Sequence, residues 1–423
     1  MADTDCIIVG AGLAGLACGK TLARAGRSVL LLDAAERAGG RVATDSVSGF
    51  RVDRGFQVYL EAYPEGRKLL ELGALRMGWF EPGALVIEQG RLREVSDPWR
   101  RPVAALRSLL SGAVSFDDAL RIASLRRGVV ARARAGTLDA VASAAAGEVS
   151  TRAALARQGF TDAFVDRFFA PFFGGVFLER ALDTSEAVFA FTFAMFALGR
   201  AGLPQGGMAA IPAQLAGSLP AGSLRLGTRV AAVEPGAVTL AGGERLVARE
   251  VVVATEAFVA AKLLPAAAPR HQRHWKGTRM LAFAAGRSPL GRPILVVGAD
   301  AGGVIDNLVV PSDVAGGYAP PGAALVTVTV RPECTLGDSD AIAAVKAEAG
   351  KLFGSAVQSW RHLETVHVPR SLPDESPAAR ALRPKSPRVA EGLSVCGDWC
   401  TTSSINGALA SGRLAAEGVL AGR

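Results

Sequence analysis

The sequence predicts an α/β fold built around a parallel β-sheet. Near the N-terminus, DCIIVG is a β-branched run of the kind that forms a buried parallel strand, and a glycine-rich loop and an amphipathic stretch follow it. Near the C-terminus, GLSVCGD repeats the order of apolar run and glycine, and a helix-like run rich in small residues comes next. The chain has 423 residues, half of them hydrophobic, which is enough for a large core and about two domains.

The composition narrows the function classes. Charged residues make up 20% of the chain, and few aromatic residues lie among the basic ones, which argues against a nucleic-acid-binding protein. The formal charge of +8 suits an anionic membrane surface better. Five scattered cysteines fit a reducing cytoplasm, and MADTDCIIVG does not have the form of a secretion signal. The apolar run from Ala187 to Leu198 is too short to span a bilayer, so we expect a cytoplasmic protein, at most peripheral at the inner face of the membrane.

The loop after the first predicted strand has the form of a dinucleotide-binding loop. It reads GAGLAG and matches G-x-G-x-x-G at Gly10, Gly12 and Gly15, with Ala11 and Ala14 between the glycines. In this motif the first glycine permits a tight turn, the second lets the backbone approach a pyrophosphate, and the third allows close helix–strand packing. The following helix presents free N–H groups and the positive end of its dipole to the phosphates.

The acid expected at the end of the next strand is also present. SVLLLD ends in Asp33, whose carboxylate suits ribose hydroxyls and would repel a 2′-phosphate. Because strand, loop, helix and acid occur together, we predict a Rossmann-like domain that binds NAD or FAD.

The residues after Asp33 favour FAD. Five residues separate this acid from Gly39, Gly40 and Arg41, and the arrangement resembles the flavoprotein superfamily of amine oxidases, protoporphyrinogen oxidases and phytoene desaturases. The resemblance implies that the glycines let the backbone pass close to the cofactor and that the arginine meets its diphosphate. Most members carry Glu where this chain has Asp33, and the shorter side chain should still reach the ribose. The resemblance also implies that GFQV, Gly55 to Val58, lines the flavin ring.

Further segments resemble the same superfamily. LPQGGM precedes a predicted helix, as the family's Gly-Gly-Met segment does, and the strands that follow would place Val230 against the adenine and end at Thr255. The resemblance implies that Gly397 and Asp398 meet the ribityl and phosphate part of FAD, while Ser404 caps a helix whose N-terminus faces the flavin. The candidate FAD-binding residues are Gly10, Ala11, Gly12, Ala14, Gly15, Asp33, Gly39, Gly40, Arg41, Gly55, Phe56, Gln57, Val58, Val230, Thr255, Gly397, Asp398, Ser404 and Ile405.

The same C-terminal stretch, CGDWCTTSSINGALASG, also allows two other interpretations. Its two cysteines suggest a metal or redox site, and its adjacent hydroxyl residues suggest a nucleophile. The flavin interpretation makes the spacing of Cys396 and Cys400 a coincidence and makes the neighbouring hydroxyls capping groups. Gly407 and Gly412 would then let the helix press close to the flavin ring and the first strand.

The FAD-binding domain is predicted to be discontinuous, because its motifs lie in separate parts of the chain. It would comprise residues 1–80, 205–265 and 365–423. A mixed α+β substrate domain would comprise residues 81–204, which look mainly helical, and residues 266–364, which look mixed.

Eleven of the 18 phenylalanines fall between Phe160 and Phe196. A single phenylalanine there is ordinary core, but the density of the cluster also fits the wall of a cavity for a large apolar ligand. We therefore expect one wall of a hydrophobic substrate tunnel in this region. The candidate pocket residues are Phe172, Phe173, Phe193 and, from the C-terminal stretch, Trp399, which fits either core or pocket.

No side chain stands out as an acid, base or nucleophile. The resemblance implies that hydride passes from the substrate to flavin N5, so the protein has to exclude water and position a C–H bond. Lys276 is a weak catalytic candidate, because amine oxidases of the superfamily often place a lysine near N5; a surface lysine is the alternative. His271 and His274 form H-x2-H, but nothing nearby completes a metal site, and we expect no metal.

One departure from the pattern of the superfamily bears on the substrate class. Amine oxidases of the superfamily usually carry an aromatic residue just before the last helix, whereas Ser403 to Asn406 contains no ring. This favours a phytoene desaturase-like enzyme: an FAD-dependent oxidoreductase that removes hydride from C–H bonds of a bulky, apolar or amphipathic substrate and passes electrons to oxygen or a quinone. The alternatives are an amine or protoporphyrinogen oxidase, a flavin isomerase without net redox change, and a binding protein similar to Rab escort and GDP-dissociation-inhibitor proteins.

Contact with a membrane is a further hypothesis. Trp99 lies among arginines in RLREVSDPWRRPVAALR, a mixture that suits an interfacial patch; a solvated charged face is the alternative.

Overall fold

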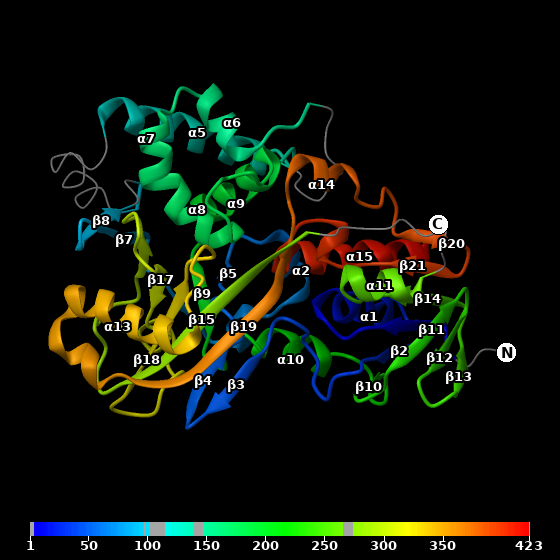
Figure 1. The fold of residues 1–423 in the computed structure, drawn as a ribbon. Coiled ribbons are helices and arrows are strands. Elements are labelled where there is room, and N and C mark those ends of the chain that lie inside the picture. The colour runs from blue at the N-terminus through cyan, green and yellow to red at the C-terminus, as the bar shows by residue number, and fades with distance from the viewer. Residues whose placement is uncertain (1–3, 97–98, 101–114, 139–146, 265–273, 423) are drawn as a thin grey trace.

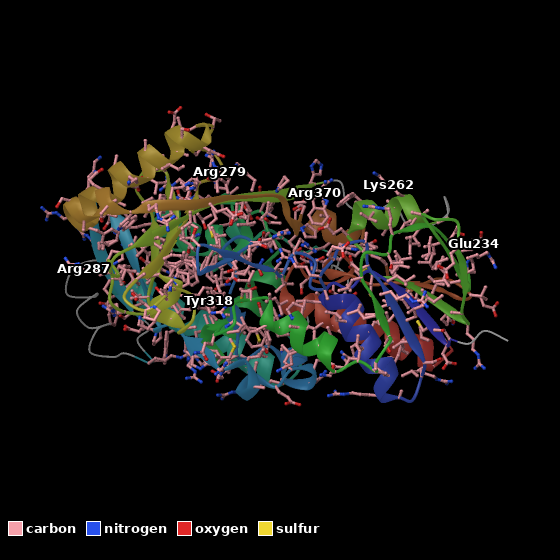
Figure 2. All side chains as sticks on the ribbon, turned by 90° about the horizontal axis from the view of Figure 1, so that it is seen from below. Glu234, Lys262, Arg279, Arg287, Tyr318 and Arg370 are labelled. Atoms are coloured by element: carbon pink, nitrogen blue, oxygen red, sulfur yellow. The ribbon has the colours of Figure 1, made fainter. Side chains whose placement is uncertain are left out.

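The computed structural model describes residues 4–96, 99–100, 115–138, 147–264 and 274–422. A parallel sheet with its helices forms one side of the molecule, a larger mixed sheet forms the other, and a group of helices lies over the mixed sheet (Figure 1). Charged side chains such as Glu234, Lys262 and Arg287 lie at the periphery, whereas Tyr318 lies inside (Figure 2). None of the described helices combines the length and the apolar character that crossing a bilayer requires.

A six-stranded sheet has the strand order β10-β2-β1-β14-β21-β20, and its neighbours are parallel except for the edge pair β21 and β20. Alternate residues of its central strand enter two cores: Cys6 and Ile8 face one, while Ile7 and Val9 face the other. Burial on both faces explains why this run contains no charged residue. The strands are β1 (Cys6–Val9), β2 (Val29–Leu32), β10 (Leu224–Arg225), β14 (Glu250–Val253), β20 (Arg388–Ala390) and β21 (Leu393–Val395).

Helices α1 (Leu13–Arg24) and α15 (Ile405–Leu420) pack against each other on one face of this sheet. A Cβ at Gly412 would lie 2.0 Å from the carbonyl oxygen of Ala14, so only glycine permits this approach. Gly412 thus lets the last helix approach the first helix, and the predicted approach to the first strand stays a prediction. The other face carries the antiparallel strands β11 (Val230–Glu234), β12 (Ala237–Leu240) and β13 (Arg245–Val247) and helix α11 (Ala257–Leu263).

A seven-stranded mixed sheet forms the second layer, in the order β19-β15-β18-β17-β16-β7-β8. One side of it packs against helix α13 (Asp338–Phe353) through Val345 and Ala349. Its edge hairpin lies within residues 81–204, so the expectation of a mainly helical segment is wrong for this part. The strands are β7 (Gly83–Glu88), β8 (Arg91–Ser96), β15 (Trp275–Ala285), β16 (Leu295–Gly298), β17 (Ile305–Val309), β18 (Ala324–Val330) and β19 (Arg361–Pro373).

Apart from this hairpin and strand β9 (Ala201–Pro204), the regular elements that the structure describes within residues 81–204 are helices, as predicted, and most of the phenylalanine cluster lies in them. Its rings pack edge-to-face and stacked at centroid distances such as 4.8 Å between Phe173 and Phe189. The helices are α5 (Phe116–Arg134), α6 (Thr151–Arg157), α7 (Asp162–Phe164), α8 (Ala170–Phe177) and α9 (Glu186–Leu198), with a π-helical turn at Val165–Phe169.

Short elements connect these layers. Met208, of the Gly-Gly-Met segment, donates its N–H to Asp53 and precedes helix α10 (Ala210–Gly217). The boundaries of the two domains stay a prediction. The remaining elements are β3 (Thr44–Val47), β4 (Phe50–Asp53), β5 (Tyr59–Leu60), β6 (Met77–Trp79), β9 (Ala201–Pro204), α2 (Pro64–Leu69), α3 (Leu72–Leu75), α12 (Pro311–Val314), α14 (Pro377–Ala381) and the 3-10 turns Gly354–Ser359 and Asp398–Cys400.

Candidate cofactor and substrate site

A cavity of about 520 Å³ begins at the carboxyl edge of the six-stranded sheet and reaches the mixed sheet and helices α8 and α9. Gly10 follows β1, Asp33 follows β2, Thr255 follows β14 and Gly397 follows β21, and all four line the cavity. Ligands of open α/β sheets bind at this edge, because the carboxyl ends of parallel strands and the N-termini of the following helices meet there.

The glycine loop shapes this end of the cavity. Gly10 has a φ of +110°, which favours glycine, and a Cβ at Gly15 would lie 1.9 Å from the carbonyl oxygen of Gly10. Gly12 differs from both, because a Cβ there would meet no atom within 4 Å and would project into the cavity space. Gly15 and the buried Ala11 are not among the residues that line the cavity, so they act on the shape of the loop.

Asp33 supports the same loop. Its Oδ2 accepts a hydrogen bond from the N–H of Ala11 at 2.6 Å, and its Oδ1 accepts one from the N–H of Ala35 at 2.8 Å. Each carboxylate oxygen keeps a free lone pair, and the side chain lines the cavity. The contact with a ribose stays a prediction.

Arg41 links the loops of the front and back ends of the chain. Its Nη2 lies 2.6 Å from Oδ1 of Asp398, its Nη1 donates to the carbonyl of Ser371 at 2.7 Å, and its Nε lies 3.4 Å from Oε1 of Glu256. Burial lowers the pKa of Arg41, but the two carboxylates outweigh it and leave the pKa above its ordinary value. Glu256 also lines the cavity and has a pKa raised by burial.

The N-terminus of α15 opens into the cavity. Ser404 is its N-cap, with Oγ accepting from the N–H of Gly407 at 2.9 Å, as predicted. A Cβ at Gly407 would lie 2.0 Å from the carbonyl oxygen of Thr402, so this glycine is required by its own turn rather than by a ring. The unpaired N–H groups and the dipole of a helix N-terminus favour negative charge, and here they face the cavity.

Most of the predicted cofactor residues come together in this cavity. The ones that line it are Gly10, Gly12, Ala14, Asp33, Gly39, Gly40, Arg41, Gly55, Phe56, Gln57, Val58, Val230, Thr255, Gly397, Asp398, Ser404 and Ile405.

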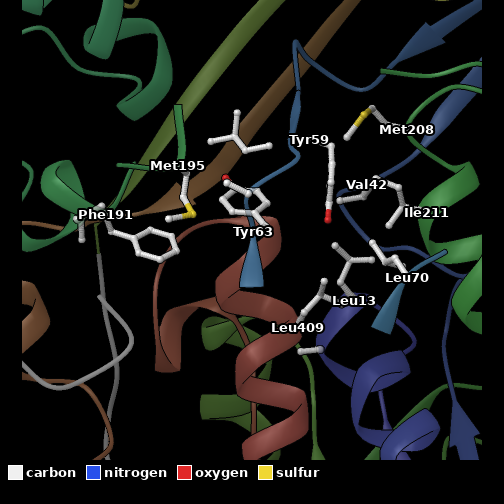
Figure 3. Packing of buried hydrophobic residues seen from close by; sticks show 14 of the residues in the cluster. Leu13, Val42, Tyr59, Tyr63, Leu70, Phe191, Met195, Met208, Ile211 and Leu409 are labelled. Carbon is white, nitrogen blue, oxygen red and sulfur yellow. The ribbon is translucent and has the colours of Figure 1, made fainter. Parts of the chain in front are cut away.

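The far end of the cavity is apolar. The side chains that form it include Tyr63, Phe172, Val176, Phe177, Val188, Phe191 and Phe196. Tyr63 stacks on Phe191 with ring centroids 6.4 Å apart and an interplanar angle of 7° (Figure 3).

Three predicted pocket residues lie outside the lining. Phe173 is 1% exposed and packs against Phe172 and Phe189, and Phe193 stacks on Phe189 with centroids 5.8 Å apart. Trp399 is 2% exposed and donates its indole N–H to the carbonyl of Thr255 at 3.0 Å. The structure therefore does not place these three predicted residues in the cavity lining: Phe173 and Trp399 are enclosed by protein, and the partly buried Phe193 packs on Phe189.

Charged groups at the far end are paired. Nζ of Lys276 lies 3.4 Å from Oε1 of Glu179 and donates to Oγ1 of Thr184 at 3.2 Å. Glu375 is buried, which raises its pKa, and it forms an ion pair with Arg383. Lys276, Thr184 and Glu375 all line the cavity.

Several lining residues have no sequence signal. Tyr63, Thr184, Glu256, Asn307 and Glu375 reach the cavity only through the tertiary fold. Among the described residues, no group of three or more His, Cys, Asp or Glu side chains could hold a metal ion, and His271 lies outside the described residues.

The fold and the cavity define an α/β protein with a dinucleotide site at the carboxyl edge of a parallel sheet. The family model for flavin-containing amine oxidoreductases matches residues 13–420, and the chain belongs to this family. It is therefore an FAD-dependent oxidoreductase, as the resemblance implied, and the family match supports neither the isomerase nor the binding-protein alternative.

Known relatives agree with this family. A stretch of 54 residues is 50% identical to an L-amino acid dehydrogenase of Synechocystis, and it spans 12% of this chain and 12% of that protein. Wild-type putrescine oxidase bound to putrescine has a similar fold, with a TM-score of 0.74, 18% identity and 99% of each chain covered. Cyclohexylamine oxidase from Brevibacterium oxydans has a TM-score of 0.70 at 19% identity over 99% of this chain and 98% of its own. At these identities the likeness concerns the fold.

The residues present fit FAD. The open space at Gly12 would be filled by any larger side chain, and the N-termini of α1 and α15 both face the cavity. Gly39 and Gly40 have φ angles of +123° and +60°, a backbone conformation that residues with a side chain rarely adopt. The backbone takes this conformation where it passes the glycine loop.

Proposed function

We propose that this enzyme is a dehydrogenase or desaturase-like oxidoreductase acting on a bulky, largely apolar substrate. The observation that carries the proposal is the far wall of the cavity, which is formed by Phe172, Phe177, Phe191 and Phe196. Burial of apolar surface against such a wall would supply most of the binding energy. When bound, FAD supplies the acceptor for a hydride from a substrate C–H bond, and oxygen or a quinone then takes the electrons.

The chain's own contribution is positioning and exclusion of water. The phenylalanine wall holds the apolar body of the substrate, and the N-terminus of α15, capped by Ser404, stabilises negative charge that develops in the cavity.

An amine or protoporphyrinogen oxidase is the second candidate. The likeness in fold to putrescine oxidase and cyclohexylamine oxidase favours an amine substrate. Two observations weigh against an ammonium group: Ser403 to Asn406 contains no ring, and the carboxylates of Glu179 and Glu375 are each engaged by a cation.

The substrate classes are separated by anaerobic mixing of the purified holoenzyme with polyenes, porphyrinogens and amines while the flavin absorbance is followed. We expect a polyene or another extended apolar compound to bleach the flavin. Bleaching by simple amines alone would overturn the proposal. Reoxidation by air or by a soluble quinone then identifies the acceptor.

Lys276 is the proposed polar residue closest to the chemistry. It lines the cavity and is oriented by Glu179 and Thr184. We expect Lys276→Met to slow reduction of the flavin, whereas Lys262→Met, at an exposed position of α11, should have no effect. An unchanged rate of flavin reduction in Lys276→Met would show that this lysine has only a structural role.

We also propose that α5 touches an anionic membrane. Phe116 and Leu120, one turn apart, are 71% and 56% exposed, and Trp99 is 43% exposed beside the guanidinium of Arg126. Arg101 and Arg107 lie outside the described residues. We expect the protein to co-sediment with anionic liposomes at low salt, and Phe116→Ser with Leu120→Ser to prevent this, whereas Leu382→Ser, 64% exposed elsewhere, should not.

A further inference from the structure

The hydroxyl of Tyr63 has no hydrogen-bond partner among the described residues. The side chain is 8% exposed, lines the apolar end of the cavity and stacks on Phe191. Burial raises the pKa of Tyr63, so the phenol stays protonated and can both donate and accept. The oxygen of Tyr63, unlike that of Tyr59, is not among the enclosed atoms that lack a partner, so it is accessible from the cavity and can be satisfied there by a ligand or a water.

Asn307, another lining residue, has an unsatisfied group of a different kind, because its amide oxygen is enclosed by protein atoms. Its side chain amide donates from Nδ2 to Oδ2 of Asp306 at 3.3 Å, which fixes the orientation of the amide because a carboxylate only accepts. Its Oδ1 is buried and has no partner. The residue is 3% exposed and lines the cavity next to Gly175 of α8, where a Cβ would lie 3.5 Å from Nδ2.

The charges around these two groups cancel within the protein. Asp306 forms an ion pair with Arg180 at 2.9 Å, and Lys276 and Glu179 face each other at 3.4 Å. A carboxylate or ammonium on the substrate would find no free counter-charge among these groups and would lose its hydration on entry. A neutral hydroxyl, carbonyl or amide would find both a donor and an acceptor in the hydroxyl of Tyr63, which is open to the cavity.

The geometry points to a subsite for a neutral hydrogen-bonding group on the substrate, with Tyr63 as its specificity-determining residue. This inference rests on the proposed function, because it assumes that the apolar end of the cavity holds the substrate. It narrows the substrate from a pure hydrocarbon to an apolar body that carries one neutral polar substituent.

A matched set of probes tests the subsite without turnover. The set is 2-ethylnaphthalene, 2-naphthalenemethanol, 2-naphthoate and 2-(aminomethyl)naphthalene, which share one skeleton and differ in the end group. Dissociation constants are measured from the change in the flavin spectrum of the oxidised holoenzyme and by calorimetry. We expect the alcohol to bind about threefold to tenfold more tightly than the ethyl compound, which is the gain from one net hydrogen bond. The carboxylate and the ammonium compound should bind more weakly than the alcohol.

Tyr63→Phe removes the hydroxyl alone, and the chain offers a close control. Tyr59 is also buried, its ring lies 5.6 Å from that of Tyr63, and its hydroxyl also lacks a partner, but it packs toward Gly66 and is not among the lining residues. Figure 3 shows both rings. We expect Tyr63→Phe to bring the alcohol-to-ethyl ratio close to one and Tyr59→Phe to leave it unchanged.

The outcomes separate this inference from the proposed function. If all four probes bind equally, or if the ratio survives Tyr63→Phe, the subsite is wrong while the apolar cavity stands. If none of the probes binds, including the ethyl compound, the apolar substrate site fails and the subsite fails with it. Tyr63→Phe removes no hydrogen bond of the folded protein, so its thermal stability should match that of the wild type.

Discussion

Nη2 of Arg41 lies 2.6 Å from Oδ1 of Asp398, and the contact joins two loops that are 357 residues apart in the chain. Asp398 follows the last parallel strand, has a side chain that is 7% exposed, and forms an ion pair with the arginine. The Gly-Gly-Arg and Gly-Asp elements of the sequence therefore act together, because Arg41 of the first pairs with Asp398 of the second at the edge of the cavity.

Arg41→Met should destabilise the apoprotein by about 2–3 kcal/mol, because it leaves Asp398 and Glu256 without their counter-charge. It should also lower the fraction of protein that retains FAD through gel filtration. Urea unfolding and the ratio of flavin to protein absorbance measure the two effects. Arg37→Met is the control, since its pair with Asp45 is largely exposed and should be worth less than about 1 kcal/mol. Equal losses in the two variants would contradict the assigned role of Arg41.

Gly12 and Gly15 should separate cofactor binding from folding. Gly12→Ala adds a methyl group to open cavity space, so the apoprotein should lose about 1 kcal/mol or less, the cost of a poorer N-cap, while FAD binding weakens. Gly15→Ala would press on the carbonyl of Gly10 and should cost about 2–3 kcal/mol in the apoprotein. Urea unfolding of both apoproteins and FAD titration by fluorescence quenching distinguish them. Strong FAD binding by Gly12→Ala would show that this loop does not approach the cofactor.

Phe172 and Phe173 are adjacent in sequence, but their substitution by leucine should have opposite effects on stability and on probe binding. Phe173→Leu is expected to lower the free energy of unfolding by about 1–2 kcal/mol, because Phe173 is 1% exposed in a packed cluster, and to leave probe binding unchanged. Phe172→Leu should cost less than about 1 kcal/mol in stability and weaken the binding of 2-ethylnaphthalene severalfold. Weaker probe binding in Phe173→Leu alone would place the wall of the cavity on the other face of α8.

Local features of the fold could be predicted from the sequence because adjacent residues determine them. The turn at Gly10, the end of α1 before Gly26 and the cap at Ser404 each depend on the conformational freedom or side chain of one residue within a few positions. The edge hairpin was missed although a signal exists, since Gln89 and Gly90, both with positive φ, separate two runs of strand-forming residues.

Local sequence could not predict which single phenylalanines line the cavity and which pack against other rings. Helices α8 and α9 are apolar on several faces, so their periodicity does not say that Phe191 reaches the cavity while Phe193 stacks on Phe189. The polar residues of the far end, such as Asn307, come from strands and loops whose neighbours are distant in sequence, and only the tertiary fold brings them together.

Asp53 is the buried carboxyl beside the cavity that should make stability depend on pH. Oδ1 accepts from Thr44 at 2.5 Å and from the N–H of Met208 at 3.0 Å, and Oδ2 accepts from the hydroxyl of Tyr318 at 2.6 Å. Burial outweighs these hydrogen bonds and raises the pKa of Asp53 from 3.8 to about 6. Asp53 lines a small second cavity together with Gly55 and Phe56 of the predicted flavin-lining segment.

The sign of the effect follows from the raised pKa. Between about pH 4 and pH 6 the folded protein holds a proton on Asp53 that the unfolded chain has already lost, so the free energy of unfolding falls as the pH rises through this range. With pKa values of 3.8 in the unfolded chain and about 6 in the folded protein, the contribution of Asp53 to the free energy of unfolding should be about 2 kcal/mol larger at pH 4.5 than at pH 7. Asp53→Asn removes the titrating group. The difference in the free energy of unfolding between wild type and variant, measured by urea unfolding, should therefore change by that amount between the two pH values. Parallel pH profiles for wild type and Asp53→Asn would show that the carboxyl titrates normally and that its three hydrogen bonds, rather than burial, dominate its environment.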